Sequence, residues 1–208
     1  MTNWRPFLLI ALLSPALLHA DGRCGAPALE APDNAYKALI HGLHRQLEIP
    51  SDYVERTGLP LQPQAETLHL IAIDQRRGAF FMSPDAARAW LRMQAAARMD
   101  GVELFPASTF RSVFQQTTLL NRRLDNGRAI DAILRTSAAP GHSEHHTGDA
   151  IDIATPGGPG LTREFAETDA FAWLEARADE FCFALSYPED NDNGLIFEPW
   201  HWMFQRGE

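Results

Sequence analysis

Two short stretches of this chain combine imidazole and carboxylate groups in a pattern that suits a metal ion. His145 and Asp152 lie in the first stretch, and His201 lies near the C-terminus. Two imidazoles and one carboxylate can bind zinc, and three protein ligands leave the fourth tetrahedral position open, as in catalytic sites. Glu198, close to His201, is then a candidate acceptor for a proton of a water molecule that the metal activates. The pattern predicts a metal-dependent hydrolase.

The spacing of the first stretch indicates how two of these groups meet. Side chains alternate along a strand, so over residues 149–154 Asp152 shares one face with two small alanines, while two isoleucines point into a core. Gly148 permits a tight turn just before this strand, which would fold His145 back over the carboxylate. We therefore expect the side chain of His145, in a loop, to meet the side chain of Asp152, in a strand.

The second stretch places His201 between two tryptophans, where it could be either a ligand or a packed core residue. The neighbouring Glu198 favours the ligand interpretation, because a carboxylate in an apolar stretch is costly to bury unless it is paired or near a metal. Pro199 indicates a bend, which could bring Glu198 and His201 to the same side.

Other histidines compete for the role of ligand. His142 and His146 flank His145, and composition alone does not rank the three. We expect His41 and His44 to be exposed on a helix, and His69 to be packed within a strand.

The composition limits the classes of partner. The chain has 208 residues, enough for one well-filled domain, and a formal net charge of −9, which argues against binding to nucleic acid. No block of basic residues indicates a membrane-surface patch. We expect a monomer.

The N-terminus has the layout of a secretory signal peptide. Arg5 precedes an apolar run from Phe7 to Leu18, and Ala20 is a small residue suited to cleavage. The run is short for a membrane span, and Pro15 interrupts it. We therefore expect a signal peptide at residues 1–20, a periplasmic or otherwise exported protein, and no stable membrane insertion after cleavage.

The sequence has two cysteines, Cys24 and Cys182. In an oxidising compartment they could form a disulfide, and the alternative is one buried thiol and one free terminal thiol. Neither has a histidine or second cysteine at metal spacing, so both are excluded from the metal site.

Hydrophobic periodicity and turn residues predict a mixture of helices and strands without a regular βαβ order, which favours the α+β class. The predicted helices cover residues 35–47, 85–99, 113–124 and 162–180. The predicted strands cover residues 68–73, 79–82, 102–107, 149–154, 183–187 and 200–204. An extended connector joins the first helix to the first strand.

Three separated motifs resemble those of the VanY-type D-alanyl-D-alanine carboxypeptidases. The stretch Ser143-Glu-His-His-Thr-Gly-Asp-Ala-Ile-Asp152 matches their Ser-x-His-x-x-Gly-x-Ala-x-Asp motif, and Glu198-Pro-Trp-His201 matches their Glu-x-x-His motif. Ser108-Thr-Phe-Arg-Ser112, followed by Gln116, and Ser186-Tyr187-Pro188 resemble two further segments. The resemblance spans roughly residues 65–205 in the same order.

The resemblance implies an α+β fold shared with lysostaphin-type peptidases and the hedgehog domain: a small antiparallel sheet flanked by helices, with the zinc site on the sheet. It implies a catalytic domain at 65–208, preceded by an N-terminal helix and connector at 21–64. It also implies roles for individual residues. These are Zn²⁺ ligation by His145, Asp152 and His201, general base and acid catalysis by Glu198, oxyanion stabilisation by Arg111, and substrate contact by Gln116 and Ser143.

The chain departs from the family pattern at His146, where Gln is common, at Cys182-Phe183, where Gly-Phe is common, and at Thr109, where Gly is usual. The expected activity is release of the terminal D-alanine from peptidoglycan stem peptides. L,D-carboxypeptidase and D,D-endopeptidase action on the same peptides use the same chemistry and remain alternatives. A non-catalytic zinc-containing peptidoglycan-binding module is a third, which the presence of both Glu198 and Arg111 disfavours.

Overall fold

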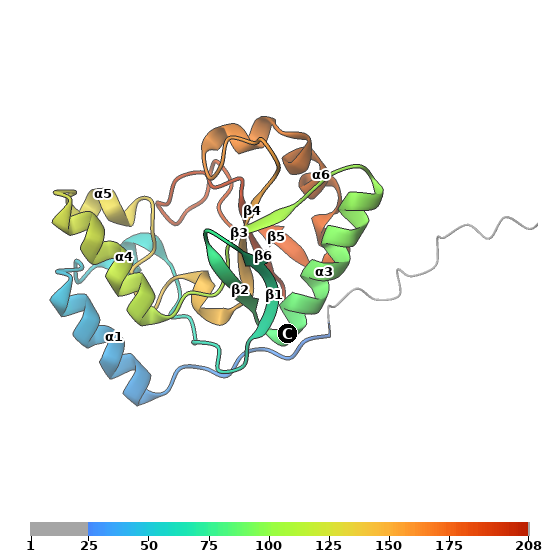
Figure 1. Cartoon of the computed structure of the whole chain (residues 1–208). Helices are drawn as coiled ribbons and strands as arrows, with labels where there is room; N and C mark the ends of the chain where they lie inside the picture. Colours follow the sequence, from blue (N-terminus) through green and yellow to red (C-terminus); the bar gives the residue numbers. More distant parts are fainter. Residues whose placement is uncertain (1–24, 208) are drawn as a thin grey trace, which may run out of the picture.

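A four-stranded antiparallel sheet forms the centre of the molecule in a computed structural model that describes residues 25–207 (Figure 1). Its strands are β3 (Phe105–Ser108), β4 (Ala150–Ala154), β5 (Phe183–Leu185) and β6 (His201–Phe204), in the spatial order β3-β4-β6-β5. A separate antiparallel hairpin consists of β1 (His69–Asp74) and β2 (Gly78–Met82). The expected fold class is confirmed: helices flank a small antiparallel sheet.

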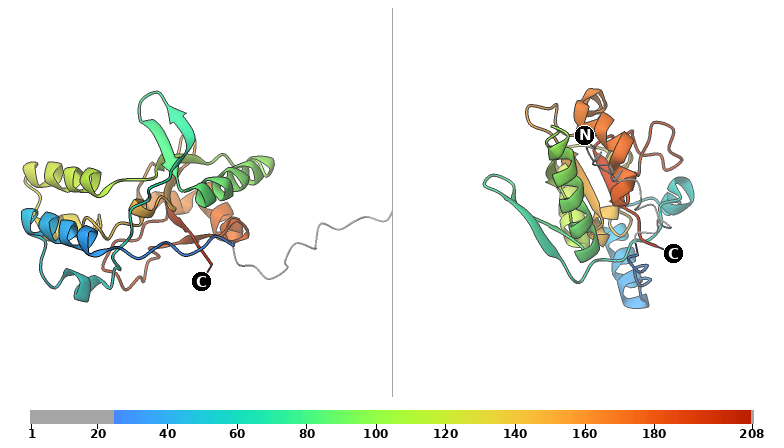
Figure 2. Two further views of the ribbon diagram at one scale, coloured as in Figure 1. Left: turned by 90° about the horizontal axis from the view of Figure 1, so that it is seen from below. Right: turned by 90° about the vertical axis from the view of Figure 1, so that its right-hand side faces the viewer.

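The helices form two groups on opposite sides of this sheet (Figures 1 and 2). One group is α1 (Asn34–Gln46), α2 (Tyr53–Thr57), α4 (Val113–Asp125) and α5 (Ile130–Leu134). The other is α3 (Pro84–Met99) and α6 (Asp169–Arg177). The described residues also form three short 3₁₀ helices, η1 (Glu144–Thr147), η2 (Arg163–Glu167) and η3 (Ala178–Phe181).

The longer helices α1, α3, α4 and α6 begin where the sequence supplies a side-chain cap. Ser83 accepts a hydrogen bond from the backbone of Ala86, and Pro84 occupies the first turn of α3. Ser112 and Gln115 form a reciprocal capping box at the start of α4. This cap fixes the point at which the chain leaves β3 and enters α4, and Arg111 lies at that junction.

The largest hydrophobic cluster lies between the central sheet and the α3–α6 group. Trp90 of α3, Ile151 and Ile153 of β4, and Phe183 of β5 are almost completely buried in it. A second cluster, which includes Leu120 of α4 and Tyr53 of α2, lies among the helices of the other group and contains no residue of the central sheet. The first cluster therefore holds the sheet in place, and β4 is buried along nearly its whole length.

Two predictions of secondary structure were wrong. The single helix expected at 162–180 is η2, α6 and η3, because Thr168 adopts an extended backbone (φ −91°, ψ 152°) and caps α6 with its hydroxyl. The connector after α1 contains α2, whose end is set by Gly58 in the left-handed region (φ 62°). Both breaks depend on single backbone conformations that hydrophobic periodicity does not record.

Two predictions about histidines were also wrong. His69 is exposed, because the β1–β2 hairpin projects away from the body of the molecule (Figure 2). His44 is only partly exposed, and its Nε2 lies 2.8 Å from the carbonyl oxygen of Pro140.

The ends of the chain bear on two further expectations. Cys182 is disulfide-bonded, whereas Cys24 and the expected signal peptide lie outside the described residues. Within residues 25–207, no helix has both the length and the apolar character needed to cross a bilayer.

Candidate active site

The register of the central sheet places three polar residues side by side. Asp152 of β4 pairs with Ser108 of β3 on one side and with His201 of β6 on the other. Directly opposite residues on neighbouring strands have Cβ atoms only about 4.5–5.5 Å apart, so their side chains meet. The site is therefore built on the most buried strand of the fold.

A tight turn adds His145 to this row. Gly148 ends η1 in the left-handed region (φ 72°), and a Cβ atom there would lie 2.9 Å from the backbone nitrogen of Ser83. Glycine alone fits this position without strain or collision. The turn reverses the chain between η1 and β4, so His145 lies over Asp152, as the sequence predicted.

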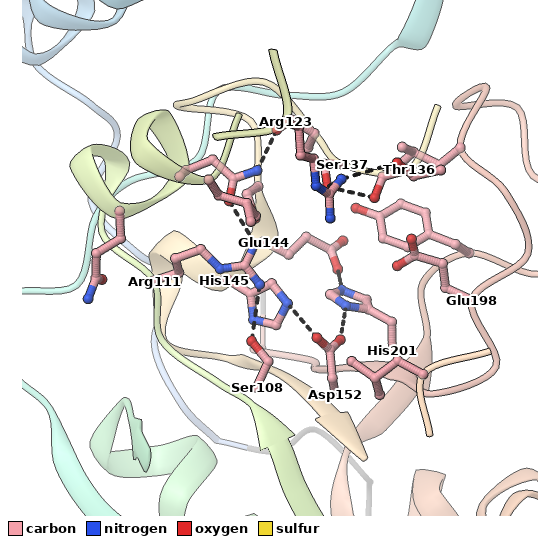
Figure 3. A pocket seen from close by; sticks show the side chains of 18 of the residues that line it. Ser108, Arg111, Arg123, Thr136, Ser137, Glu144, His145, Asp152, Glu198 and His201 are labelled. Carbon is pink, nitrogen blue, oxygen red and sulfur yellow. Dashed lines mark hydrogen bonds and ion pairs between the residues drawn. The ribbon is translucent and has the colours of Figure 1, made fainter. Parts of the chain in front are cut away.

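His145, Asp152 and His201 form a compact cluster (Figure 3). Each offers one ligand atom within 4.8 Å of the other two, and all three residues are buried. Asp152 Oδ1 lies 2.8 Å from His201 Nδ1, and Asp152 Oδ2 lies 3.3 Å from His145 Nε2. Among the described residues, no other group of three or more histidine, cysteine or acidic side chains is arranged so that it could hold a metal ion.

The protonation states of the cluster suit a cation. Burial alone would lower the pKa of His201, but hydrogen bonds to Asp152 and Glu144 and their negative charges raise it to about 10. Burial would raise the pKa of Asp152, yet His145 and His201 hold it well below its usual range. Burial also lowers the pKa of His145, which favours the neutral imidazole that a metal requires. A metal ion at His201 Nδ1 would take the place of a proton.

The donor set fits zinc. Two imidazole nitrogens and a carboxylate oxygen are zinc ligands, and three of them leave a position for water or substrate. His145 Nδ1 is buried without a hydrogen-bond partner among the described residues. Only the other ring nitrogen, Nε2, has a polar partner, which is Asp152. We conclude that these three residues could hold the ion.

Glu144 is a functional candidate that sequence reasoning missed. Its Oε2 lies 2.9 Å from His201 Nε2, on the side of the ring away from Asp152. A carboxylate on the outer nitrogen of a metal-binding histidine fixes its tautomer and orientation, and leaves the other nitrogen for the metal. The available signal was its position beside His145, but the contact with a residue so far along the chain becomes visible only in the fold.

Tyr187 was noted only as part of a motif, and the structure places it in the site. Its ring centroid lies 5.0 Å from that of His201, and the residue is buried. Burial, together with the charges of Glu144, Glu198 and Asp152, raises the pKa of its phenol, so the hydroxyl stays neutral. It forms part of the cleft wall beside His201.

Glu198 and His201 line the same cleft, joined by a turn in which His201 N donates to Glu198 O at 2.9 Å. The Glu198 carboxylate points into the cleft (Figure 3). Burial raises its pKa to about 7, with Asp152 and Glu144 adding to the effect and His201 and Arg111 opposing it. A carboxyl group with a pKa near neutrality can both accept and return a proton.

Arg111 is held rigidly at the opposite side of the cluster. Its Nη1 donates to Gln116 Oε1 at 2.7 Å, and its Nη2 donates to Ser108 Oγ at 3.0 Å. Gln116 is completely buried, and its amide nitrogen donates to Ala138 O. Both polar groups of Gln116 therefore have partners within the protein, and the side chain holds Arg111 in place.

The structure also separates His145 from the histidines beside it. His146 Nε2 accepts from the backbone N–H of Gly141 at 3.0 Å, and its Nδ1 therefore donates to Arg111 O at 2.6 Å. His142 Nδ1 bonds to backbone oxygens of the connector, 3.0 Å from Leu59 O. Both rings are used to fix the backbone around the site. Ser143 is buried at the start of η1 and lines the cleft.

Comparison with known proteins assigns the family. The model of the VanY D-alanyl-D-alanine carboxypeptidase family matches residues 79–207. The chain therefore belongs to this family, which confirms the resemblance seen in the sequence.

Two relatives illustrate the relationship. The chain is 28% identical to YodJ of Bacillus subtilis (strain 168) over 85% of its own length and 62% of that protein, so it spans less than two thirds of this relative. It is 27% identical to the bifunctional D-Ala-D-Ala dipeptidase and carboxypeptidase VanXYC of Enterococcus gallinarum, over 70% of this chain and 78% of that one.

Solved structures share the fold. The LdcB LD-carboxypeptidase is 25% identical with a TM-score of 0.61, over 70% of this chain and 71% of that one. A VanY D,D-pentapeptidase mutant in complex with Zn(II) is 24% identical with a TM-score of 0.55, over 70% of this chain and 84% of that one.

Proposed function

We propose that this protein is an exported, zinc-dependent carboxypeptidase that removes the terminal D-alanine from peptidoglycan stem peptides. The observation that carries the proposal is the convergence of His145, Asp152 and His201 in one cleft with Glu198, inside the region that matches the family. The signal-peptide layout of residues 1–20 supports export.

The ion and the carboxylate of Glu198 have separate tasks. A zinc ion held by His145, Asp152 and His201 would supply Lewis-acid chemistry, which lowers the pKa of water and polarises a peptide carbonyl. Glu198 takes a proton from a water molecule in the cleft as the water attacks the carbonyl carbon. Glu198 then gives that proton to the nitrogen of the leaving amino acid.

Arg111 stabilises the negative charge that develops on the carbonyl oxygen. Gln116 and Ser108 hold its guanidinium before substrate arrives, so no rearrangement is needed during the reaction. A prepositioned donor of this kind contributes about 3 kcal/mol to lowering the barrier. Glu144 keeps His201 in the orientation that presents Nδ1 to the metal. Ser143 remains a predicted substrate contact. The predicted contact of Gln116 would require its amide to exchange a bond to Arg111 or Ala138 for one to the substrate.

Incubation of the purified zinc form with a muropeptide pentapeptide tests the proposal. Mass spectrometry should show loss of one alanine from the substrate, and a chelator should stop the reaction. A pentapeptide that stays intact with zinc bound would contradict the proposed function.

The alternative substrates share the same chemistry. L,D-carboxypeptidase action is favoured by one observation, the similarity in fold to the LdcB LD-carboxypeptidase. D,D-endopeptidase action would use the same catalytic residues on a crosslinked peptide, and a non-catalytic zinc-containing peptidoglycan-binding module would bind without cleavage. Parallel digestion of tetrapeptide, pentapeptide and crosslinked muropeptides distinguishes these cases.

A further inference from the structure

The cleft continues from the metal cluster along α4. Its volume is about 810 Å³, and one wall is a face of α4 formed by Gln115, Leu119 and Arg122, spaced as successive turns of a helix. Arg123 and Arg128 also line it. We call Arg122, Arg123 and Arg128 the arginine end of the cleft. None of these three arginines has a role in the proposed reaction.

The charges of the arginine end have no acidic partner. Among the ion pairs formed within residues 25–207, none involves Arg122, Arg123 or Arg128. The chain as a whole carries 27 acidic residues against 18 basic ones, so such a cluster runs against its composition. Like charges repel, and this concentration of positive charge in a cleft is the arrangement expected of an anion-binding site.

Arg123 is positioned for binding by neutral groups. Its Nη1 donates to Thr136 Oγ1 at 3.2 Å and to Ser137 Oγ at 2.7 Å. These hydroxyls fix the guanidinium without neutralising it. Figure 3 shows this guanidinium directed into the cleft, across from Asp152. Burial and the nearby charge of Arg128 lower the pKa of Arg123, and Glu198 opposes them, so Arg123 is influenced by both ends of the cleft.

The distance along α4 indicates how far the arginine end lies from the metal cluster. Arg123 lies seven residues after Gln116, which corresponds to roughly 10 Å along the helix axis. An extended peptide spans about 3.3–3.6 Å per residue. A substrate whose scissile bond lies at the metal cluster would therefore reach the arginine end within about three residues.

We propose that Arg122, Arg123 and Arg128 form a subsite for a carboxylate of the substrate peptide. The planar guanidinium fork matches a carboxylate with two parallel hydrogen bonds, which a hydroxyl or an amide would not exploit. The inference rests on the proposed function, because it assumes that the cleft binds a peptide. A reach of about three residues favours an acidic group earlier in the peptide as the source of this carboxylate. The free C-terminus of the leaving residue lies only one residue from the scissile bond, and the C-terminal amide tests it as the other source.

Binding measurements test the subsite without turnover. The zinc-loaded full chain carrying Glu198→Gln is titrated calorimetrically with three probes: a pentapeptide with a free C-terminus, its C-terminal amide, and a pentapeptide whose internal carboxylates are amidated. Arg123→Gln in this background should weaken binding of the free pentapeptide by about 10-fold or more, the scale of a lost hydrogen bond to a charged group. Arg92→Gln, an exposed substitution on α3 outside the cleft, is the matched control and should change nothing.

The probes identify the source of the carboxylate. If the effect of Arg123→Gln on affinity disappears with the C-terminal amide, the subsite binds the free C-terminal carboxylate. If the effect disappears with the internally amidated peptide, the subsite binds an internal carboxylate. With Glu198 intact, either result should appear as a raised KM at nearly constant kcat.

A second variant protects the test against misfolding. Arg122→Gln with Arg128→Gln changes exposed side chains and leaves the Thr136 and Ser137 contacts intact. Unchanged affinity of both the Arg123 variant and this double variant for the free pentapeptide would overturn the proposal, as would equal weakening for all three probes. A protein that binds the probes through this subsite but never releases alanine would instead reject the proposed function.

Discussion

The two ends of the cleft hold their charged groups in different ways. At the metal end, Asp152, His145 and His201 are buried, and the Asp152 carboxylate has both histidines as partners. At the arginine end, Arg122 and Arg128 are exposed and lie on a helix and the loop after it. Strand register fixes the side chains of the metal end, whereas the side chains of the arginine end lie on the exposed surface and can move. We infer that the metal end determines the reaction, whereas the arginine end determines which peptide is chosen.

Glu198→Gln should have the largest effect and should be confined to the metal end. The amide cannot accept a proton, so we expect kcat to fall by roughly 10²- to 10⁴-fold. Zinc content, measured by mass spectrometry of the metal, should stay at one ion per chain because Glu198 is not a ligand. Unchanged turnover would remove Glu198 from the mechanism.

Glu144→Ala tests whether the orientation of His201 depends on its outer partner. Loss of the contact with Nε2 should weaken zinc affinity by about 10- to 100-fold in a competition titration with a chelating dye. The control is Glu175→Ala, an exposed position on α6 that does not line the cleft. Equal zinc affinity in the two variants would show that Glu144 does not position His201.

Gly148→Ala tests the turn that brings His145 to the metal end. The added Cβ would meet the Ser83 backbone, and the backbone conformation itself would be strained, so a loss of about 1–3 kcal/mol in stability is expected. Gly157→Ala is a matched control, since Gly157 has a similar φ of 67° but nothing within 4 Å of its Cβ position. Thermal unfolding should show the larger decrease for Gly148→Ala, accompanied by weaker zinc binding. Equal decreases would mean that the contact with Ser83 is unimportant.

The smallest expected effect is a shift in the pH dependence of kcat/KM. It tests whether the charge of the arginine end influences the pKa of Glu198 at the metal end. Glu198 acts only when deprotonated, and its pKa is raised from 4.5 to about 7 in the protein without metal. Activity should therefore rise with pH through an acid limb below about 7, since bound zinc adds positive charge and lowers this pKa. Arg123→Gln removes a positive charge that interacts with Glu198, so the limb should move to higher pH. A shift to lower pH would contradict this electrostatic link.

The sequence predicted the metal end better than the rest of the molecule. The alternation around Asp152 and the turn at Gly148 are local properties, and both were visible before the fold was known. The partnership of Glu144 with His201 was not, because it depends on how β6 pairs with β4. The same holds for the arginine end, where a helix face, a loop and two hydroxyls converge from separate segments.

Single backbone conformations also escaped prediction. Thr168 divides a segment whose periodicity is helical throughout, and its extended backbone is stabilised by the cap it provides to α6. Residues 162–180 were therefore predicted as one helix. Local pattern predicted the elements well where burial dominates and poorly where a cap or a left-handed residue decides the path of the chain.

The most direct test of the account is a crystal structure of the protein grown with zinc, with diffraction recorded on both sides of the zinc absorption edge. We predict one anomalous peak in the cleft, from an ion bound by one nitrogen each of His145 and His201 and by the Asp152 carboxylate, with Glu144 still bonded to the outer nitrogen of His201. An anomalous peak elsewhere, or none at these three residues, would contradict it.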